Sequence, residues 1–150
     1  MLDFNRIENR QSQEIGKIKV RVKLTNVIDE ELVSRGLLNP NQLRYYETEA
    51  LIDTGAVRSV IPMQIVQKLG LRIRRQQLAT YADGRQEMVG ITGAILIEIE
   101  GRETTEAALV TGDDVLISQT VLEGLDLLVD CKNHRLIPNP KNPDAPVFRI

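Results

Sequence analysis

Apolar and polar residues alternate along several stretches of the chain, which is the spacing of strands that are buried on one face. Residues 17–24 show the pattern most clearly, since every second side chain there is apolar. A longer strand is expected over residues 85–100, and a partner strand over residues 103–110 follows a turn at Gly101. The pattern therefore predicts an all-β, mainly antiparallel fold.

Shorter apolar runs indicate further strands, and one dipeptide marks a tight connection between two of them. Asp83-Gly84 favours the hairpin turn that joins antiparallel strands, so residues 71–82 and 85–100 are expected to pair. Residues 26–45 are expected to be irregular, because breakers such as Pro40 interrupt any periodic pattern. Other extended segments are expected at residues 48–53, 115–117, 127–131 and 135–138.

One or two short helices complete the predicted fold. Pro62 can open a helix at its first position, because its fixed φ suits that place, and Gly70 can close it. Ser118 is expected to be the N-cap of a second helix, which runs through Leu125.

The composition is that of one folded domain with an aliphatic core. The chain has 150 residues, 42% of them hydrophobic, while aromatic residues make up only 3%. We expect a flexible polar arm over residues 1–16, the folded domain over residues 17–138 and a proline-rich tail over residues 139–150.

The charge pattern argues against nucleic acid and membranes as partners. The net charge is −2 with both signs interspersed, which leaves no basic footprint for nucleic acid, and the run of arginines at 72–75 is expected to be the solvated face of a strand. No apolar run reaches membrane-spanning length, and the N-terminus lacks the apolar segment of a signal peptide. A soluble cytoplasmic protein is expected.

Cys131 and His134 have a spacing that could suggest a metal site. They are the only cysteine and the only histidine, whereas a structural zinc site needs four ligands. A turn is expected there instead, with no metal and no cofactor, and a single cysteine excludes an intrachain disulfide.

The candidate chemistry lies at the tight turn Asp53-Thr54-Gly55-Ala56. Apolar residues 50–52 lead into this turn and residues 59–62 lead out of it. An Asp at the end of an apolar strand is costly to desolvate unless it is partnered, so Asp53 is a candidate for acid–base chemistry. The alternative is an ordinary β-turn, since Asp, Thr and Gly are common turn residues.

With these flanks, the turn resembles the active-site loop of the retroviral-type (retropepsin-like) single-domain aspartic proteases, in particular their bacterial branch. The similarity extends over residues 17–138. Leu116, Ile117 and Ser118 resemble the second apolar strand and the start of the helix that support this loop. The segment that resembles the substrate-covering flap is Tyr81, Ala82, Asp83, Gly84 and Arg85, although the flap tip could also lie nearer Gly90.

The resemblance implies an aspartic endopeptidase that works as a homodimer on extended peptides. Asp53 from each subunit would form the catalytic dyad and activate a water molecule. Thr54 would hydrogen-bond across the two-fold axis, Gly55 would leave room for the substrate backbone, and the flap would pair with the peptide. Tyr81 fits either a flap tyrosine or a tyrosine packed on the sheet.

Three positions depart from the family pattern and leave an alternative open. Val57 and Gln119 stand where retroviral enzymes usually have a paired Asp and Arg, and Ser118 stands where they have Gly. The Ser118 side chain could crowd the Asp53 loop or cap the helix, and the sequence favours the cap. The alternatives are a weak or inactive dimeric peptide-binding or scaffold module of the same fold, and an unrelated β domain with a chance turn.

Overall fold

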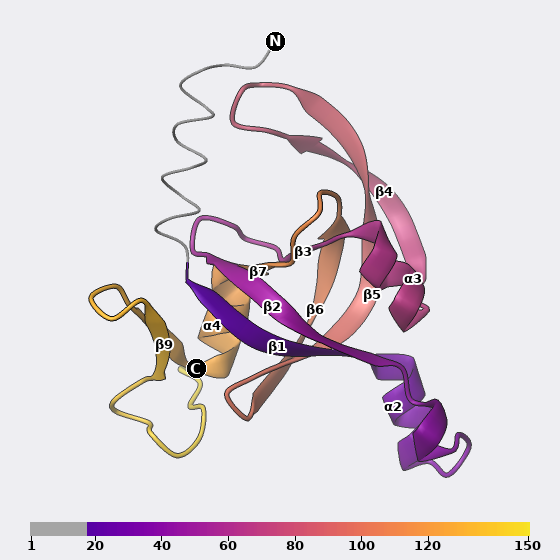
Figure 1. Ribbon diagram of the computed structural model, residues 1–150, viewed down its shortest axis with the longest axis horizontal. Coiled ribbons are helices and arrows are strands. Elements are labelled where there is room, and N and C mark those ends of the chain that lie inside the picture. The colour runs from indigo at the N-terminus through magenta and orange to yellow at the C-terminus, as the bar shows by residue number, and fades with distance from the viewer. Residues whose placement is uncertain (1–17) are drawn as a thin grey trace.

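The protein is a barrel of β-strands with short helices (Figure 1). The computed structural model describes residues 18–150, and the arm predicted for residues 1–16 lies outside the described residues. The helices are α2 (Val27–Ser34), α3 (Met63–Leu69), α4 (Gln119–Leu125) and the 3₁₀ turn η1 (Pro40–Gln42). The strands are β1 (Lys19–Asn26), β2 (Tyr45–Asp53), β3 (Val60–Ile61), β4 (Ile73–Thr80), β5 (Gln86–Ile99), β6 (Arg102–Val110), β7 (Leu116–Ser118), β8 (Leu127–Asp130) and β9 (Arg135–Pro138).

The strands close on themselves. Their order around the barrel is β1-β2-β7-β3-β6-β5, and β5 pairs again with β1, while β4 extends the sheet outward from β5. Most pairings are antiparallel, but β2 runs parallel to β7 and β3 runs parallel to β6. β8 and β9 form a separate antiparallel pair. The predicted all-β, mainly antiparallel fold is therefore confirmed.

Strand β5 forms part of both the β4–β5 hairpin and the barrel. Its first part pairs with β4 to form a long hairpin, whereas residues 95–98 pair with β1 and close the barrel. The register with β6 shifts between Ile91 and Ala94, and there the buried hydroxyl of Thr92 accepts a hydrogen bond from the Ala108 N–H at 3.0 Å. The side chain thus satisfies a backbone donor at the point where the hairpin leaves the barrel.

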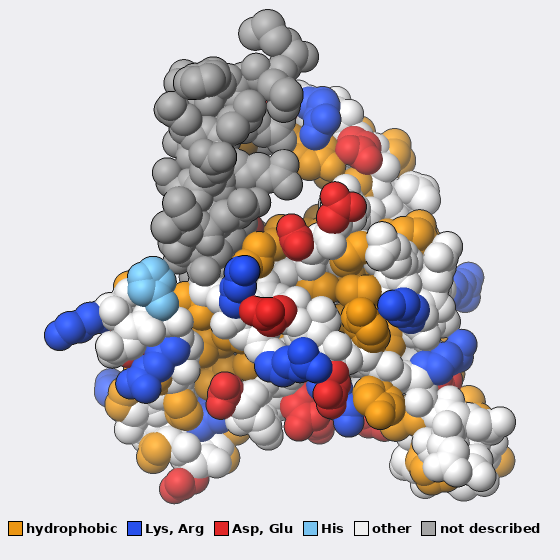
Figure 2. Space-filling view, in the orientation of Figure 1, with side chains coloured by type: hydrophobic (Ala, Val, Ile, Leu, Met, Phe, Trp, Pro, Cys, Tyr) orange, Lys and Arg blue, Asp and Glu red, His pale blue; other side chains and the backbone are white. Residues whose placement is uncertain are grey.

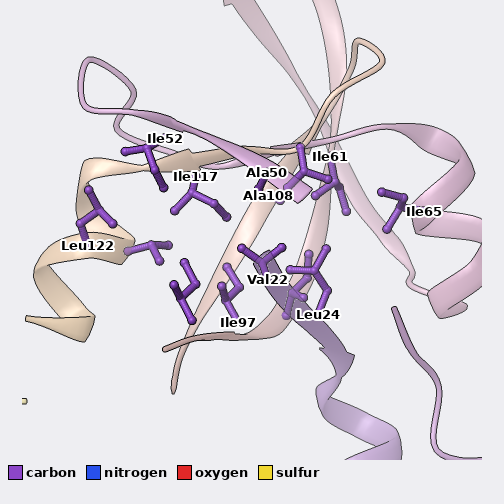
Figure 3. Close-up of a cluster of buried hydrophobic side chains, with 14 of the residues drawn as sticks. Val22, Leu24, Ala50, Ile52, Ile61, Ile65, Ile97, Ala108, Ile117 and Leu122 are labelled. Atoms are coloured by element: carbon purple, nitrogen blue, oxygen red, sulfur yellow. The ribbon is translucent and has the colours of Figure 1, made fainter. Parts of the chain in front are cut away.

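The core is aliphatic, as the composition predicts. Figure 3 shows side chains from β1, β2, β5, β7 and α4 meeting inside the barrel, among them Val22, Ile52, Ile97, Ile117 and Leu122. Each of these five is at most 4% exposed. Burial of one such side chain contributes about 1.5–3 kcal/mol, so this cluster provides much of the stability.

Helix α2 contradicts the prediction that residues 26–45 are irregular. Asn26 caps the helix by accepting a hydrogen bond from the Asp29 N–H at 3.0 Å. The buried Asp29 carboxylate then receives two bonds from the Arg44 guanidinium, at 2.8 and 3.0 Å, just before β2 begins. Because Asp29 is the only buried residue of the helix, no apolar periodicity was present to reveal it.

The two predicted helices are confirmed. Gly70 ends α3 with a left-handed φ of 61°, while Pro62 lies at the N-cap, one position before the predicted one. Helix α4 lies close against β6, because a Cβ at Gly124 would be only 3.0 Å from the Thr104 hydroxyl.

The proline-rich tail is fastened to the end of α4. The Asp126 carboxylate accepts hydrogen bonds from the Asn139 and Asn142 side-chain amides, at 3.0 and 2.7 Å, and from the Val147 N–H at 3.2 Å. Buried Arg102 donates to the carbonyl oxygens of Asp126 and Asn142, at 3.1 and 2.8 Å. Polar side chains, rather than a strand or a helix, therefore hold this segment.

Because Asp29 and Asp126 have lowered pKa values, we expect the free energy of unfolding to fall in acid. Hydrogen bonds from Arg44 hold the pKa of Asp29 below its usual value, and those from Asn139 and Asn142 lower the pKa of Asp126. A lowered folded-state pKa means that the stabilisation is present above the unfolded value, about pH 4, and is lost as the pH falls through the folded value. Urea unfolding measured from neutral pH downward should show a constant midpoint that drops below about pH 4.

An Asp29→Asn variant should be less stable at neutral pH and should lose part of this acid dependence. Asp113→Asn, at an exposed carboxylate in a loop, is the matched control and should behave like the natural chain. A midpoint that stays constant far below pH 4 would contradict the prediction.

Candidate active site

Asp53 is the last residue of β2, and it emerges where the buried part of the strand ends. Ala50 and Ile52 are only 2% and 4% exposed, whereas the side chains of Glu49, Leu51 and Asp53 alternate with them and face outward. The apolar strand therefore delivers a half-buried carboxylate to a turn, as the sequence predicts.

The turn that follows is tight and keeps space open beside the carboxylate. The Ala56 N–H donates to the Asp53 carbonyl oxygen and the Gly55 N–H donates to Asp53 Oδ1, both at 3.1 Å. Gly55 does not have a positive φ. A Cβ at this position would lie 3.4 Å from Asp53 Oδ1, at van der Waals contact, so the glycine leaves this side of the carboxylate uncovered but is not required by lack of space. Thr54 and Gly55 are both exposed.

Strand β7 runs parallel to the end of β2 and supports the turn. Leu51, Ile52 and Asp53 lie opposite Leu116, Ile117 and Ser118 in the parallel register. Ile117 is fully buried and anchors β7 in the core. The supporting strand and helix expected at these positions are therefore adjacent to Asp53.

Helix α4 holds the turn through backbone carbonyl groups. The Gln119 N–H donates to the Ala56 carbonyl oxygen at 3.0 Å, and the Thr120 hydroxyl donates to the Val57 carbonyl oxygen at 2.8 Å. The Val57 side chain is 78% exposed. The main chain at positions 56 and 57 thus connects loop and helix, where the family pattern has a side-chain ion pair.

A polar cluster beneath the turn was not predicted from the sequence. Buried Ser118 caps α4, because its hydroxyl accepts a bond from the Val121 N–H at 3.1 Å, as expected. The same hydroxyl donates to the Glu106 carboxylate at 3.1 Å, and the Ser59 N–H donates to Glu106 Oε2 at 3.1 Å. The Ser118 N–H in turn donates to the Ser59 hydroxyl at 3.0 Å.

The alternation of residues in β6 indicates the position of Glu106, although a search for short motifs would not find it. Alternate residues of β6 point inward, because Arg102, Ala108 and Val110 are buried. Glu106 has the same parity, so the strand pattern places a carboxylate on the inward side. A charged residue at such a position requires partners, which the two serines supply.

The hairpin formed by β4 and β5 has its tip at Asp83-Gly84. The Tyr81 N–H donates to the Arg85 carbonyl oxygen at 2.8 Å, and Gly84 has a positive φ of 83°. Gly90 lies opposite Gln76 within the strands, where a Cβ would be 3.0 Å from the Ile73 side chain. The tip is therefore at Asp83-Gly84 and not near Gly90.

Tyr81 links this hairpin to the loop after β6. Its hydroxyl donates to Glu87 Oε2 at 2.9 Å and lies 3.3 Å from the Thr111 hydroxyl, while the Arg85 guanidinium covers its ring at 4.4 Å. In Figure 1 the hairpin arches above the end of the barrel from which the β2–β3 loop projects. Ala82 and Asp83 are exposed at its tip.

A hollow of about 410 Å³ lies along β2. Glu49 and Leu51 line it, and they share the outward face of β2 with Asp53. Lys19 and Asp114 also contribute, so apolar and charged groups of both signs meet there. Figure 2 shows that acidic and basic side chains are interspersed over the visible face of the molecule.

Other chemistry is not apparent in the part of the chain that the structure describes. Residues 18–150 contain no cluster of three or more His, Cys, Asp or Glu side chains suited to a metal ion. Cys131 is exposed in the turn that joins β8 to β9, as is His134. No helix within the same residues is long and apolar enough to cross a membrane.

Comparison with known proteins identifies one family. Residues 41–130 match the family described as "gag-polyprotein putative aspartyl protease". The matched segment contains the Asp53 turn, the β4–β5 hairpin, β7 and α4. No individually curated protein matches the chain.

Loss of the Ser118 hydroxyl should destabilise the protein. Ser118→Ala removes both the helix cap and a donor to Glu106, so we expect the free energy of unfolding to fall by about 1–2 kcal/mol. Ser34→Ala, at an exposed serine that ends α2, is the control and should change it by less than about 0.5 kcal/mol. Urea unfolding of both variants measures the difference, and equal midpoints would contradict the assigned role.

Proposed function

The chain belongs to the aspartyl protease family of gag polyproteins, and from this premise we propose that it is an aspartic endopeptidase of the retropepsin-like type. The observation that carries the proposal is the turn Asp53-Thr54-Gly55 at the end of a buried strand, inside the matched residues 41–130. The carboxylate is half-buried, and the glycine leaves one side of it accessible.

The proposed reaction needs two carboxylates that share one proton. The ionised carboxylate takes a proton from water, the resulting hydroxide attacks the peptide carbonyl carbon, and the protonated carboxyl group donates its proton to the carbonyl oxygen. The C–N bond of the resulting gem-diol then breaks as the first carboxyl group gives its proton to the leaving nitrogen and the second takes one back from a hydroxyl group, which leaves one proton on the pair. Two close carboxylates cannot both ionise cheaply, so such a pair holds its single proton at mildly acidic pH. The pair, rather than either residue, has the apparent pKa values.

We propose that a second copy of the chain supplies the second carboxylate. The sequence has one Asp-Thr-Gly turn and no second copy of it. A two-fold interface brings the same residue of each subunit close to the axis, so two Asp53 carboxylates could face each other. Exposed Thr54 would then hydrogen-bond across the axis between the two turns.

An extended peptide is the substrate that best fits the surroundings. The β4–β5 hairpin presents Leu78 and Met88, a cross-strand pair whose side chains are 52% and 57% exposed. A peptide lying under the hairpin could pair with its backbone and contact these apolar groups. The hollow along β2 would receive a substrate side chain on the same face as Asp53.

The cytoplasm is the proposed location. Cys131 is an exposed free thiol, which suits the reducing conditions inside a cell.

Replacement of the Asp53 carboxylate should abolish proteolysis. Asp53→Asn is nearly isosteric but cannot act as a base, and the loss of acid–base catalysis costs about 10²–10⁴-fold. Hydrolysis of an unfolded protein at mildly acidic pH measures the effect. Asp113→Asn changes an exposed loop carboxylate in the same way and should leave the rate unchanged.

Two outcomes of that experiment would contradict the proposal. Full activity in Asp53→Asn would exclude Asp53 as the catalytic group. A natural chain that binds an extended peptide without cleaving it would instead support the peptide-binding module of the same fold.

The protein should be a homodimer in solution. A single Asp53 cannot complete the dyad, so activity requires association and should fall on dilution below the dissociation constant. Sedimentation velocity at micromolar concentration measures the mass. A strict monomer that cleaves peptides would exclude the proposed mechanism.

A further inference from the structure

We propose that Glu106 is a positioning residue that fixes the Asp53 loop by binding Ser59 at the end of the loop and Ser118, which lies opposite its start. The inference rests on the proposed function, because it assigns Glu106 a role in catalysis through Asp53. The carboxylate lies on β6 and is separated from Asp53 by 53 positions in the sequence. It acts through two serines that flank the loop in space.

The two contacts of Glu106 define the base of the loop. Ser118 lies opposite Asp53 in the parallel pairing of β2 with β7, at the point where the loop begins. Ser59 is where the loop ends and enters β3. Glu106 accepts a bond from the Ser118 hydroxyl and another from the Ser59 N–H, so one carboxylate holds both points.

A direct bond between the two serines completes the arrangement. The Ser118 N–H donates to the Ser59 hydroxyl at 3.0 Å, and both serines are at most 2% exposed. Among residues 18–150, no Lys or Arg forms a salt bridge with Glu106. Its charge is therefore met by hydroxyl and amide donors, and hydrogen bonds to an ionised acceptor are the stronger kind.

Among the described residues, the Asp53 loop has no salt bridge of its own. Where retroviral enzymes pair an Asp with an Arg, this chain has Val57 and Gln119, and Val57 is largely exposed. The loop still requires a fixed geometry, since a displacement of about 1 Å can cost about 100-fold in rate. Glu106 provides that constraint from beneath the loop rather than from within it.

The test compares two replacements of Glu106 in the full-length protein. Glu106→Ala removes both acceptor oxygens, and we expect kcat to fall about 10- to 100-fold with little change in KM. Glu106→Gln should restore most of the rate, because Ser59 and Ser118 both reach Oε2 and one amide oxygen can accept from both. A role in stability alone would not produce this split between kcat and KM.

Asp29→Asn is the control for general destabilisation. It too removes the charge of a carboxylate that is held by hydrogen bonds, but at the opposite end of β2 from Asp53. At a temperature where all variants remain folded, this control should keep the natural kcat.

Hydrogen exchange of backbone amides provides a readout that does not depend on activity. In Glu106→Ala, exchange should become faster in residues 53–61 and 115–121, and it should be unchanged there in Asp29→Asn. If the natural chain does not cleave peptides, the proposed function fails while exchange still tests the positioning role. Unchanged exchange in these segments, or an unchanged kcat in Glu106→Ala, would overturn the proposal.

Discussion

The parallel pairing of β2 with β7 is the constraint on which the candidate site depends. Only three residue pairs form it, and one of them places Asp53 opposite Ser118. Parallel strands cannot be joined by a tight turn, and here residues 54–115 lie between them, including the hairpin and β6. The site therefore exists only once distant segments have docked, so the short Asp53 segment could not form it alone.

Three inward-facing polar residues of strand β6 contact helix α4 and hold it in position. Glu106 binds the N-cap serine, whereas Thr104 lies against Gly124 in the last turn of the helix and Arg102 binds the carbonyl groups where the helix ends. Glu106 and Arg102 lie four residues apart on the strand, a distance comparable to the length of this short helix, so they reach its two ends. The match allows one strand to fix the position of a whole helix, and with it the Ser118 end of β7.

Features with a local cause were predictable from the sequence, whereas contacts between distant segments were predictable only where the family resemblance supplied them, as for residues 116–118 beside Asp53. Alternation revealed the long strands, and the capping role of Ser118 followed from its place before an apolar helical pattern. Helix α2 was not predicted because it has no periodic apolar face. Its one buried residue is Asp29, which forms an ion pair with Arg44. The role of Glu106 was not predicted, because it depends on Ser59 and Ser118, which are far away in the sequence.

The fastening of the tail and the closure of the barrel bear on how the protein can be shortened for expression. A fragment confined to residues 41–130 would contain the Asp53 turn but lack β1, which joins β2 to β5 and closes the ring. A fragment that stops at Pro138 would keep every described strand and helix, yet it would strip Arg102 and Asp126 of their partners in the tail. A fragment that keeps both the closed ring and these tail contacts therefore extends beyond the matched residues 41–130 and beyond the last strand.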